Sequence, residues 1–144
     1  MFCFKPGQAI HGVTLIGFLC LHAAFAGEHS ALTGAVGEKQ SGIAAVYTTR
    51  LHGHITACGE RYNKDALTTA HQTLPCGTLV RVTNPGNKKS VKLRVNDRGP
   101  TQEGRIVDLS SRAAKALGMS PDGFTHVNLT VVGKAKSGST KARL

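Results

Sequence analysis

Apolar and polar residues alternate over residues 91–95, where Lys92 and Arg94 separate valine, leucine and valine. A period of two predicts a strand with one buried face. The alternation ends at residues 96–100, Asn-Asp-Arg-Gly-Pro, whose types favour a turn. The carboxylate of Asp97 is therefore expected where a rigid strand stops, which suits a reacting group. An aspartate at such a position can equally accept hydrogen bonds from its own turn.

Other short apolar runs predict the remaining strands. They lie at residues 43–48, 78–83, 106–109 and 127–131, with a further ordered segment at 66–71. The turn residues 84–87, Asn-Pro-Gly-Asn, join 78–83 to 90–96 as a β-hairpin. Six or so short strands with a single helix predict a compact, mainly-β barrel.

The one predicted helix covers residues 111–117. Ser110 precedes it as a suitable N-cap, and Gly118 follows it as a suitable terminator. Asp108 is expected to support the start of this helix rather than to contact a ligand.

The two ends of the chain predict export and flexibility. Residues 1–26 resemble a signal peptide, with an apolar run at 13–20 and Ala-Phe-Ala before Gly27. That run is too short for a transmembrane helix, and bulky residues before Cys20 disfavour lipid attachment there. We expect a flexible leader over 27–40, a barrel domain over 41–132, a basic disordered tail over 133–144, and a periplasmic or extracellular location.

The chain is strongly basic, with a formal net charge of +10. Such a balance suits a polyanionic partner. Because the chain has no Trp and few other aromatic residues, base stacking finds little support and nucleic acid is not the expected partner. A cell wall or a membrane surface is the more plausible partner, and simple solubility explains the charge equally well.

Cys58 and Cys76 follow the predicted signal peptide, and in an oxidising compartment they can form one disulfide. Zinc is the competing use, since His54 and His71 are close in sequence. The Cys-x-x-Cys and His-x-x-x-His spacings of zinc sites are missing, so we predict the disulfide and no metal site or cofactor.

Residues 50–62 form a long connection rich in glycine and polar groups, and such loops are usually functional. Glu60 within it is either a site residue or a solvated surface carboxylate. His71, as a single histidine, is more often packed or hydrogen-bonded than catalytic.

The chain resembles the rare lipoprotein A (RlpA-like) family, whose domain is a six-stranded double-psi β-barrel with one short helix. The matching segments run in order over nearly the whole predicted barrel: residues 42–47, 52–53, 56–60, 67–71, 73–78, 80–84, 95–100, 104–110 and 113–119. Many relatives have Trp-Tyr-Gly where this chain has Val46-Tyr47-Thr48, which predicts a weaker sugar-stacking surface.

Characterised members of that family are lytic transglycosylases that cut peptidoglycan glycan strands, preferentially those without stem peptides, and leave 1,6-anhydromuramoyl ends. The resemblance implies that their Glu, His and Asp site residues correspond to Glu60, His71 and Asp97. It assigns no cofactor. Within or beside the same motifs, four further residues are expected to bind substrate: Tyr47, His52, Asn96 and Arg98.

Glycosidic cleavage needs a proton for the leaving oxygen, and the muramoyl C6 hydroxyl can serve as a tethered nucleophile. We expect Asp97 to act as general acid and then base, with His71 orienting and Glu60 stabilising charge. A guanidinium beside a carboxyl favours the ionised form, so this role requires Arg98 to point away. The alternatives are a non-catalytic, expansin-like wall-binding or wall-loosening module and, less favoured, a secreted partner-binding domain.

Overall fold

The computed structural model describes residues 31–135. The predicted signal peptide, Cys20 and all but the first residues of the basic tail lie outside this range. Within it, no helix is long and apolar enough to cross a membrane. The elements are β1 (Lys39–Val46), a 3-10 helix η1 (Thr49–Leu51), β2 (Thr68–His71), β3 (Thr78–Thr83), β4 (Ser90–Asp97), β5 (Arg105–Leu109), α1 (Ser111–Ala116) and β6 (Phe124–Lys134).

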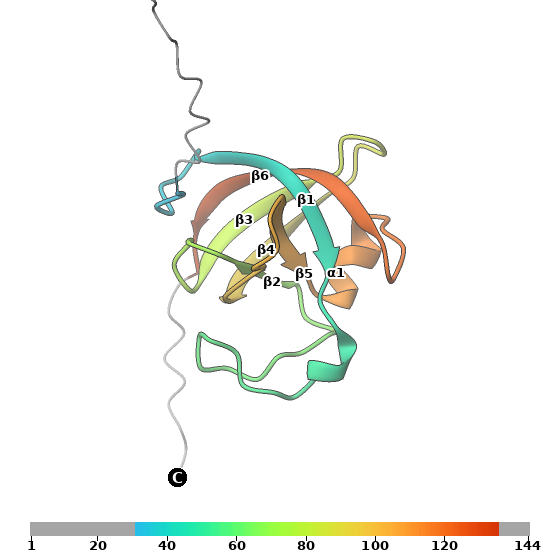
Figure 1. The fold of residues 1–144 in the computed structure, drawn as a ribbon. Helices are drawn as coiled ribbons and strands as arrows, with labels where there is room; N and C mark the ends of the chain where they lie inside the picture. Colours follow the sequence, from blue (N-terminus) through green and yellow to red (C-terminus); the bar gives the residue numbers. More distant parts are fainter. Residues whose placement is uncertain (1–30, 136–144) are drawn as a thin grey trace, which may run out of the picture.

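The six strands close into a barrel in the order β1-β5-β2-β4-β3-β6 (Figure 1). The pairs β1·β5 and β2·β4 are parallel and the other four are antiparallel. Alternate side chains fill the interior, among them Val80, Val82, Val95, Val107, Leu109, Val127, Leu129 and Val131. The predicted mainly-β barrel of six strands and one helix is confirmed.

The end strands are longer than the apolar pattern predicts. β1 begins at Lys39, inside the range expected to be a flexible leader, because it pairs with β6 from Lys39 opposite Thr130 onward. Just before it, Leu32 is buried and Glu38 accepts backbone hydrogen bonds from Thr33 and Gly34. β6 likewise runs past 132 to Lys134. Pairing between neighbouring strands, which periodicity does not reveal, sets both ends.

Each parallel pair contains one irregularity in register. Between β2 and β4 the partners pass from Thr69 opposite Val95 to Ala70 opposite Asp97, which leaves Asn96 as the extra residue. Between β1 and β5 the extra residue is Ile106. A bulge redirects the side chain that follows it. The bulge at Asn96 therefore decides which residue of β4 stands beside Ala70.

Residues 48–67 form a long excursion below one end of the barrel (Figure 1). A disulfide joins Cys58 in this excursion to Cys76, which precedes β3, and confirms the predicted pairing. Within the excursion, Ile55 and Arg61 form an isolated antiparallel β-bridge.

The helix also matches its prediction, because Ser110 Oγ accepts the Ala113 N–H as N-cap and Gly118 ends it at φ 73°. The role predicted for Asp108 is wrong. Its carboxylate pairs with Arg105 rather than with the helix.

Candidate functional site

Asp97, the last residue of β4, has a nearly buried carboxylate that accepts three hydrogen bonds. The Tyr47 hydroxyl donates to Oδ2 at 2.7 Å, while the backbone N–H groups of Ala57 and Arg98 each donate to Oδ1 at 2.8 Å. Tyr47 follows β1, and Ala57 belongs to the excursion. Two distant segments and the next residue along the chain therefore fix the orientation of one carboxylate, which suits a reacting group that must be preorganised.

Asp97 has a second carboxylate near it. Ala70 of β2 is in register with Asp97 on one side and with Asp108 of β5 on the other. Two strand spacings of about 4.8 Å separate the backbones of the two aspartates by about 10 Å. Both side chains line one small hollow together with Tyr47. The pairing of strands thus places two carboxyl groups over a single alanine.

Asp108 differs from Asp97 in its surroundings. Burial raises the pKa of Asp108 above its ordinary value, and the negative charge of Asp97 acts in the same direction. The hydrogen bond and charge of Arg105 oppose this rise without cancelling it. A carboxyl whose pKa is raised in this way can hold a proton closer to neutral pH, as a general acid must.

Tyr47 hydrogen-bonds to Asp97 and lines the small hollow that both aspartates also line. Burial, then the hydrogen bond to Asp97, raises the pKa of Tyr47 well above its ordinary value. Its ring packs against Tyr62 with centroids 4.6 Å apart. Tyr47 therefore stays a neutral hydrogen-bond donor toward Asp97.

Glu60 lies on the excursion beside the bulge of β4. Its carboxylate accepts both guanidinium hydrogen bonds of Arg94, at 2.8 and 3.0 Å, and one from Asn96 Nδ2 at 2.7 Å. Burial opposes ionisation of Glu60, but the hydrogen bonds from Arg94 and Asn96 outweigh it and keep its pKa below the ordinary value. Glu60 thus holds the bulge residue that precedes Asp97.

His71 is almost wholly buried at the end of β2. Its Nδ1 accepts the backbone N–H groups of Thr73 and Leu74, so the neutral ring carries its proton on Nε2, which donates to Gln40 Oε1 at 2.9 Å. Burial, assisted by the charge of Arg98, lowers the pKa of His71 to about 4. Both ring nitrogens of His71 are thus already hydrogen-bonded. A neutral imidazole held in this way can orient the backbone around it.

Arg98 and His52, the remaining residues predicted to bind substrate, each hydrogen-bond to other parts of the protein. The Arg98 guanidinium donates to the Leu74 carbonyl at 2.7 Å, and only its backbone N–H reaches Asp97. The guanidinium therefore points away from the Asp97 carboxyl, as an acid/base role required. His52 Nδ1 accepts the Lys64 N–H on the excursion.

The three residues predicted as catalytic make no direct hydrogen bond with one another. Asn96 joins Glu60 to the strand that carries Asp97, and the backbone of His71 accepts from Arg98 at 3.4 Å. The structure brings Asp97 together with Tyr47 and Asp108 instead. Sequence reasoning missed Asp108, although its place between Val107 and Leu109 already indicated an outward-facing side chain.

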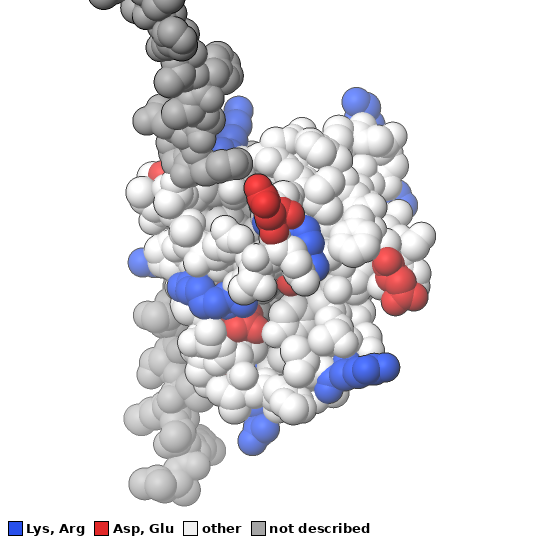
Figure 2. Space-filling model, in the orientation of Figure 1, with Lys and Arg blue, Asp and Glu red and all other residues white. Residues whose placement is uncertain are grey.

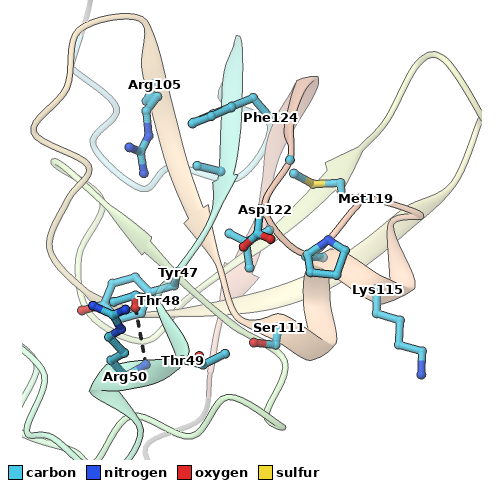
Figure 3. Close-up of a pocket in the computed structure, with 15 residues that line it drawn as sticks. Tyr47, Thr48, Thr49, Arg50, Arg105, Ser111, Lys115, Met119, Asp122 and Phe124 are labelled. Atoms are coloured by element: carbon cyan, nitrogen blue, oxygen red, sulfur yellow. Dashed lines mark hydrogen bonds between the residues drawn. The ribbon is translucent and has the colours of Figure 1, made fainter.

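A larger hollow of about 980 Å³ is also lined by Tyr47. Figure 3 shows Arg105 and Phe124 at one end of it, and Tyr47, Thr48 and Arg50 at the other. The Arg105 guanidinium lies 5.7 Å from the centre of the Phe124 ring. Because Arg105 also pairs with Asp108, this hollow adjoins the two aspartates.

The distribution of charged side chains and of possible metal ligands bears on what the site could bind. Lys and Arg side chains are spread over the face visible in Figure 2 rather than gathered into one patch. Over residues 31–135, no group of three or more His, Cys, Asp or Glu side chains is arranged to hold a metal ion.

Comparison with known proteins adds a family. A family model described as "Lytic transglycolase" matches residues 39–129. The "Endolytic peptidoglycan transglycosylase RlpA" of Campylobacter jejuni is 49% identical over 105 residues, which are 73% of this chain and 38% of that protein. The "Probable endolytic peptidoglycan transglycosylase RlpA" of Synechocystis is 52% identical over 93 residues, 65% of this chain and 29% of that protein.

Among solved structures, a mutant Clavibacter michiganensis expansin in complex with cellohexaose is 26% identical with a TM-score of 0.55, covering 72% of this chain and 54% of that one. The chain spans less than two fifths of the length of the two curated relatives.

Proposed function

The chain belongs to the lytic transglycolase family, and from that premise we propose that it is an exported, endolytic peptidoglycan lytic transglycosylase. The substrate would be peptide-poor glycan strands, cut to leave 1,6-anhydromuramoyl ends. The relatives named as peptidoglycan transglycosylases support the substrate class. The observation that carries the proposal is the in-register row of Asp97, Ala70 and Asp108.

In the first step, Asp108 delivers its proton to the glycosidic O4 while the C1–O4 bond breaks. A raised pKa suits Asp108 to this task, which the sequence had assigned to Asp97. Asp97, whose oxygens only accept hydrogen bonds, faces the developing positive charge at C1 and stabilises it.

In the second step, the C6 hydroxyl of the same muramoyl residue attacks C1. The C1–O6 bond forms, and the hydroxyl proton passes to the Asp108 carboxylate, which restores the acid. Because the nucleophile is already part of the substrate, the protein needs only to orient it. Glu60 and His71 then act as positioning residues, Glu60 through Asn96 and His71 through the turn at Thr73 and Leu74.

The test is digestion of peptide-free glycan strands, with the soluble products identified by mass spectrometry. We expect 1,6-anhydromuramoyl ends from the wild-type protein and none above background from Asp97→Asn or Asp108→Asn. Lys92→Gln, an exposed side chain earlier in β4 that lines neither hollow, is the control and should cut normally. Products from both aspartate variants at the wild-type rate would refute the mechanism.

A second function is supported by the likeness to the expansin in complex with cellohexaose. In that case the barrel binds wall polysaccharide without cutting it. Sedimentation with insoluble peptidoglycan, unchanged by Asp97→Asn and accompanied by no soluble product, would favour this alternative.

A further inference from the structure

The row of residues that contains both aspartates continues across the barrel. Ala45 of β1 is in register with Asp108 on one side and with Phe124 of β6 on the other. Five neighbouring strands thus carry Asp97, Ala70, Asp108, Ala45 and Phe124 side by side. The two alanines leave room between the larger side chains. The row therefore forms a surface with the two carboxyl groups toward one end and an aromatic ring at the other.

Phe124 is unusual in this chain. It is the only phenylalanine after residue 25, and it is 66% exposed. A single exposed apolar residue needs no explanation by itself. Phe124, however, borders the 980 Å³ hollow and lies beside the guanidinium that pairs with Asp108. An exposed ring next to a fixed cation offers an apolar face to a ligand with polar edges.

The opposite end of the hollow carries an unused positive charge. The backbone N–H of Arg50 contacts Thr48 Oγ1, while its guanidinium donates no hydrogen bond to any of residues 31–135. Arg50, Arg105 and Lys115 line the hollow, against Asp122 as the one acidic lining residue (Figure 3). This balance suits an occupant that carries a carboxylate.

We propose that this hollow is a muramoyl-binding subsite, in which Phe124 stacks on a sugar ring and Arg50 binds the lactyl carboxylate. The proposal rests on the transglycosylase function and adds a source of substrate selectivity. The lactyl carboxylate is free only where the stem peptide has been removed, since otherwise it is consumed in an amide bond. Arg50 would therefore favour peptide-free strands over intact ones.

Binding of peptide-free strands is measured in the Asp97→Asn background, so that no cutting occurs, and repeated with strands whose carboxyl groups have been reduced to alcohols. We expect Phe124→Ala to weaken binding of both kinds of glycan strand, carboxylated and reduced, about tenfold. Phe124→Tyr should bind both kinds as well as the unsubstituted side chain does. Arg50→Gln should weaken binding up to about fivefold, and only for strands with carboxylates. Ile55→Ala, an equally exposed apolar side chain outside the hollow, is the control.

Binding by Phe124→Ala at wild-type strength would overturn the subsite, as would an equal effect of Arg50→Gln on both strands. These outcomes are separate from failure of the proposed function. A protein that yields no anhydro products yet shows the expected binding losses keeps the subsite and loses the transglycosylase. A protein that cuts strands without regard to Phe124 and Arg50 keeps the activity and loses the subsite.

Discussion

The hydroxyl of Tyr47 donates a hydrogen bond of 2.7 Å to Oδ2 of Asp97, across fifty positions of sequence. The contact joins the end of β1 to the end of β4, which are not neighbours in the barrel. It places a neutral donor on the oxygen of Asp97 that no backbone group reaches. The proposed orientation of Asp97 depends on this donor.

Tyr47→Phe removes only that hydroxyl. Because two backbone donors remain on Oδ1, we expect Asp97 to stay in place but to turn more freely, with cutting slowed about tenfold and stability lowered by about 1 kcal/mol. The measurements are the rate of anhydromuramoyl product formation and urea unfolding. Tyr62→Phe is the matched control, since the Tyr62 hydroxyl makes no hydrogen bond with Asp97; equal slowing in both variants would contradict the role of Tyr47.

Much of the fold could be predicted because short-range patterns determine it. The alternation in β4, the Asn-Pro-Gly-Asn hairpin and the Ser110 cap each produce the expected element. The pairing of Cys58 with Cys76 followed from their being the two cysteines after the predicted signal peptide. The first three features depend on residues near one another in sequence, and the disulfide followed from the number of cysteines.

The arrangement of the site could be predicted less well from the sequence, because it depends on strand order and register. Nothing local indicates that Asn96 is the extra residue of a bulge, or that β5 lies beside β2. Asp108 therefore looked like a helix-start residue, although the barrel brings it beside Asp97. The contact of His71 with Gln40, which comes from a distant part of the sequence, depends on the same non-local packing.

The balance between Arg105 and Asp108 predicts how cutting depends on pH. A general acid works in its protonated form, so the rate should fall as pH rises through the raised pKa of Asp108. Arg105 lowers that pKa against the effect of burial, and Arg105→Gln should therefore move the falling limb of the kcat profile to higher pH. Arg112→Gln, which removes one charge elsewhere, should leave the limb in place; a limb that does not move in Arg105→Gln would exclude Asp108 as the acid.

The disulfide should matter for activity as well as stability, since Cys58 directly follows Ala57, whose N–H binds Asp97. Replacing both cysteines by serine opens a link with a sequence separation of 18 residues. We expect a loss of about 3 kcal/mol in the free energy of unfolding and slower cutting. Urea unfolding and the product assay measure the two effects, and wild-type protein in reductant should behave like the double variant. Unchanged stability in both samples would show that the excursion is held without the disulfide.

His71 predicts a loss of stability in mild acid. Its pKa is about 4 in the folded protein against an ordinary 6.5, so the unfolded chain takes up the proton first as pH falls. The stabilisation is complete above about pH 6.5 and is lost progressively toward pH 4, by on the order of 3 kcal/mol. His71→Asn keeps an acceptor for the Thr73 and Leu74 N–H groups but does not titrate, so its stability should be lower at neutral pH and flatter over this range. Parallel slopes for the two proteins, in urea unfolding at a series of pH values, would mean that His71 is protonated as easily in the barrel as in the unfolded chain.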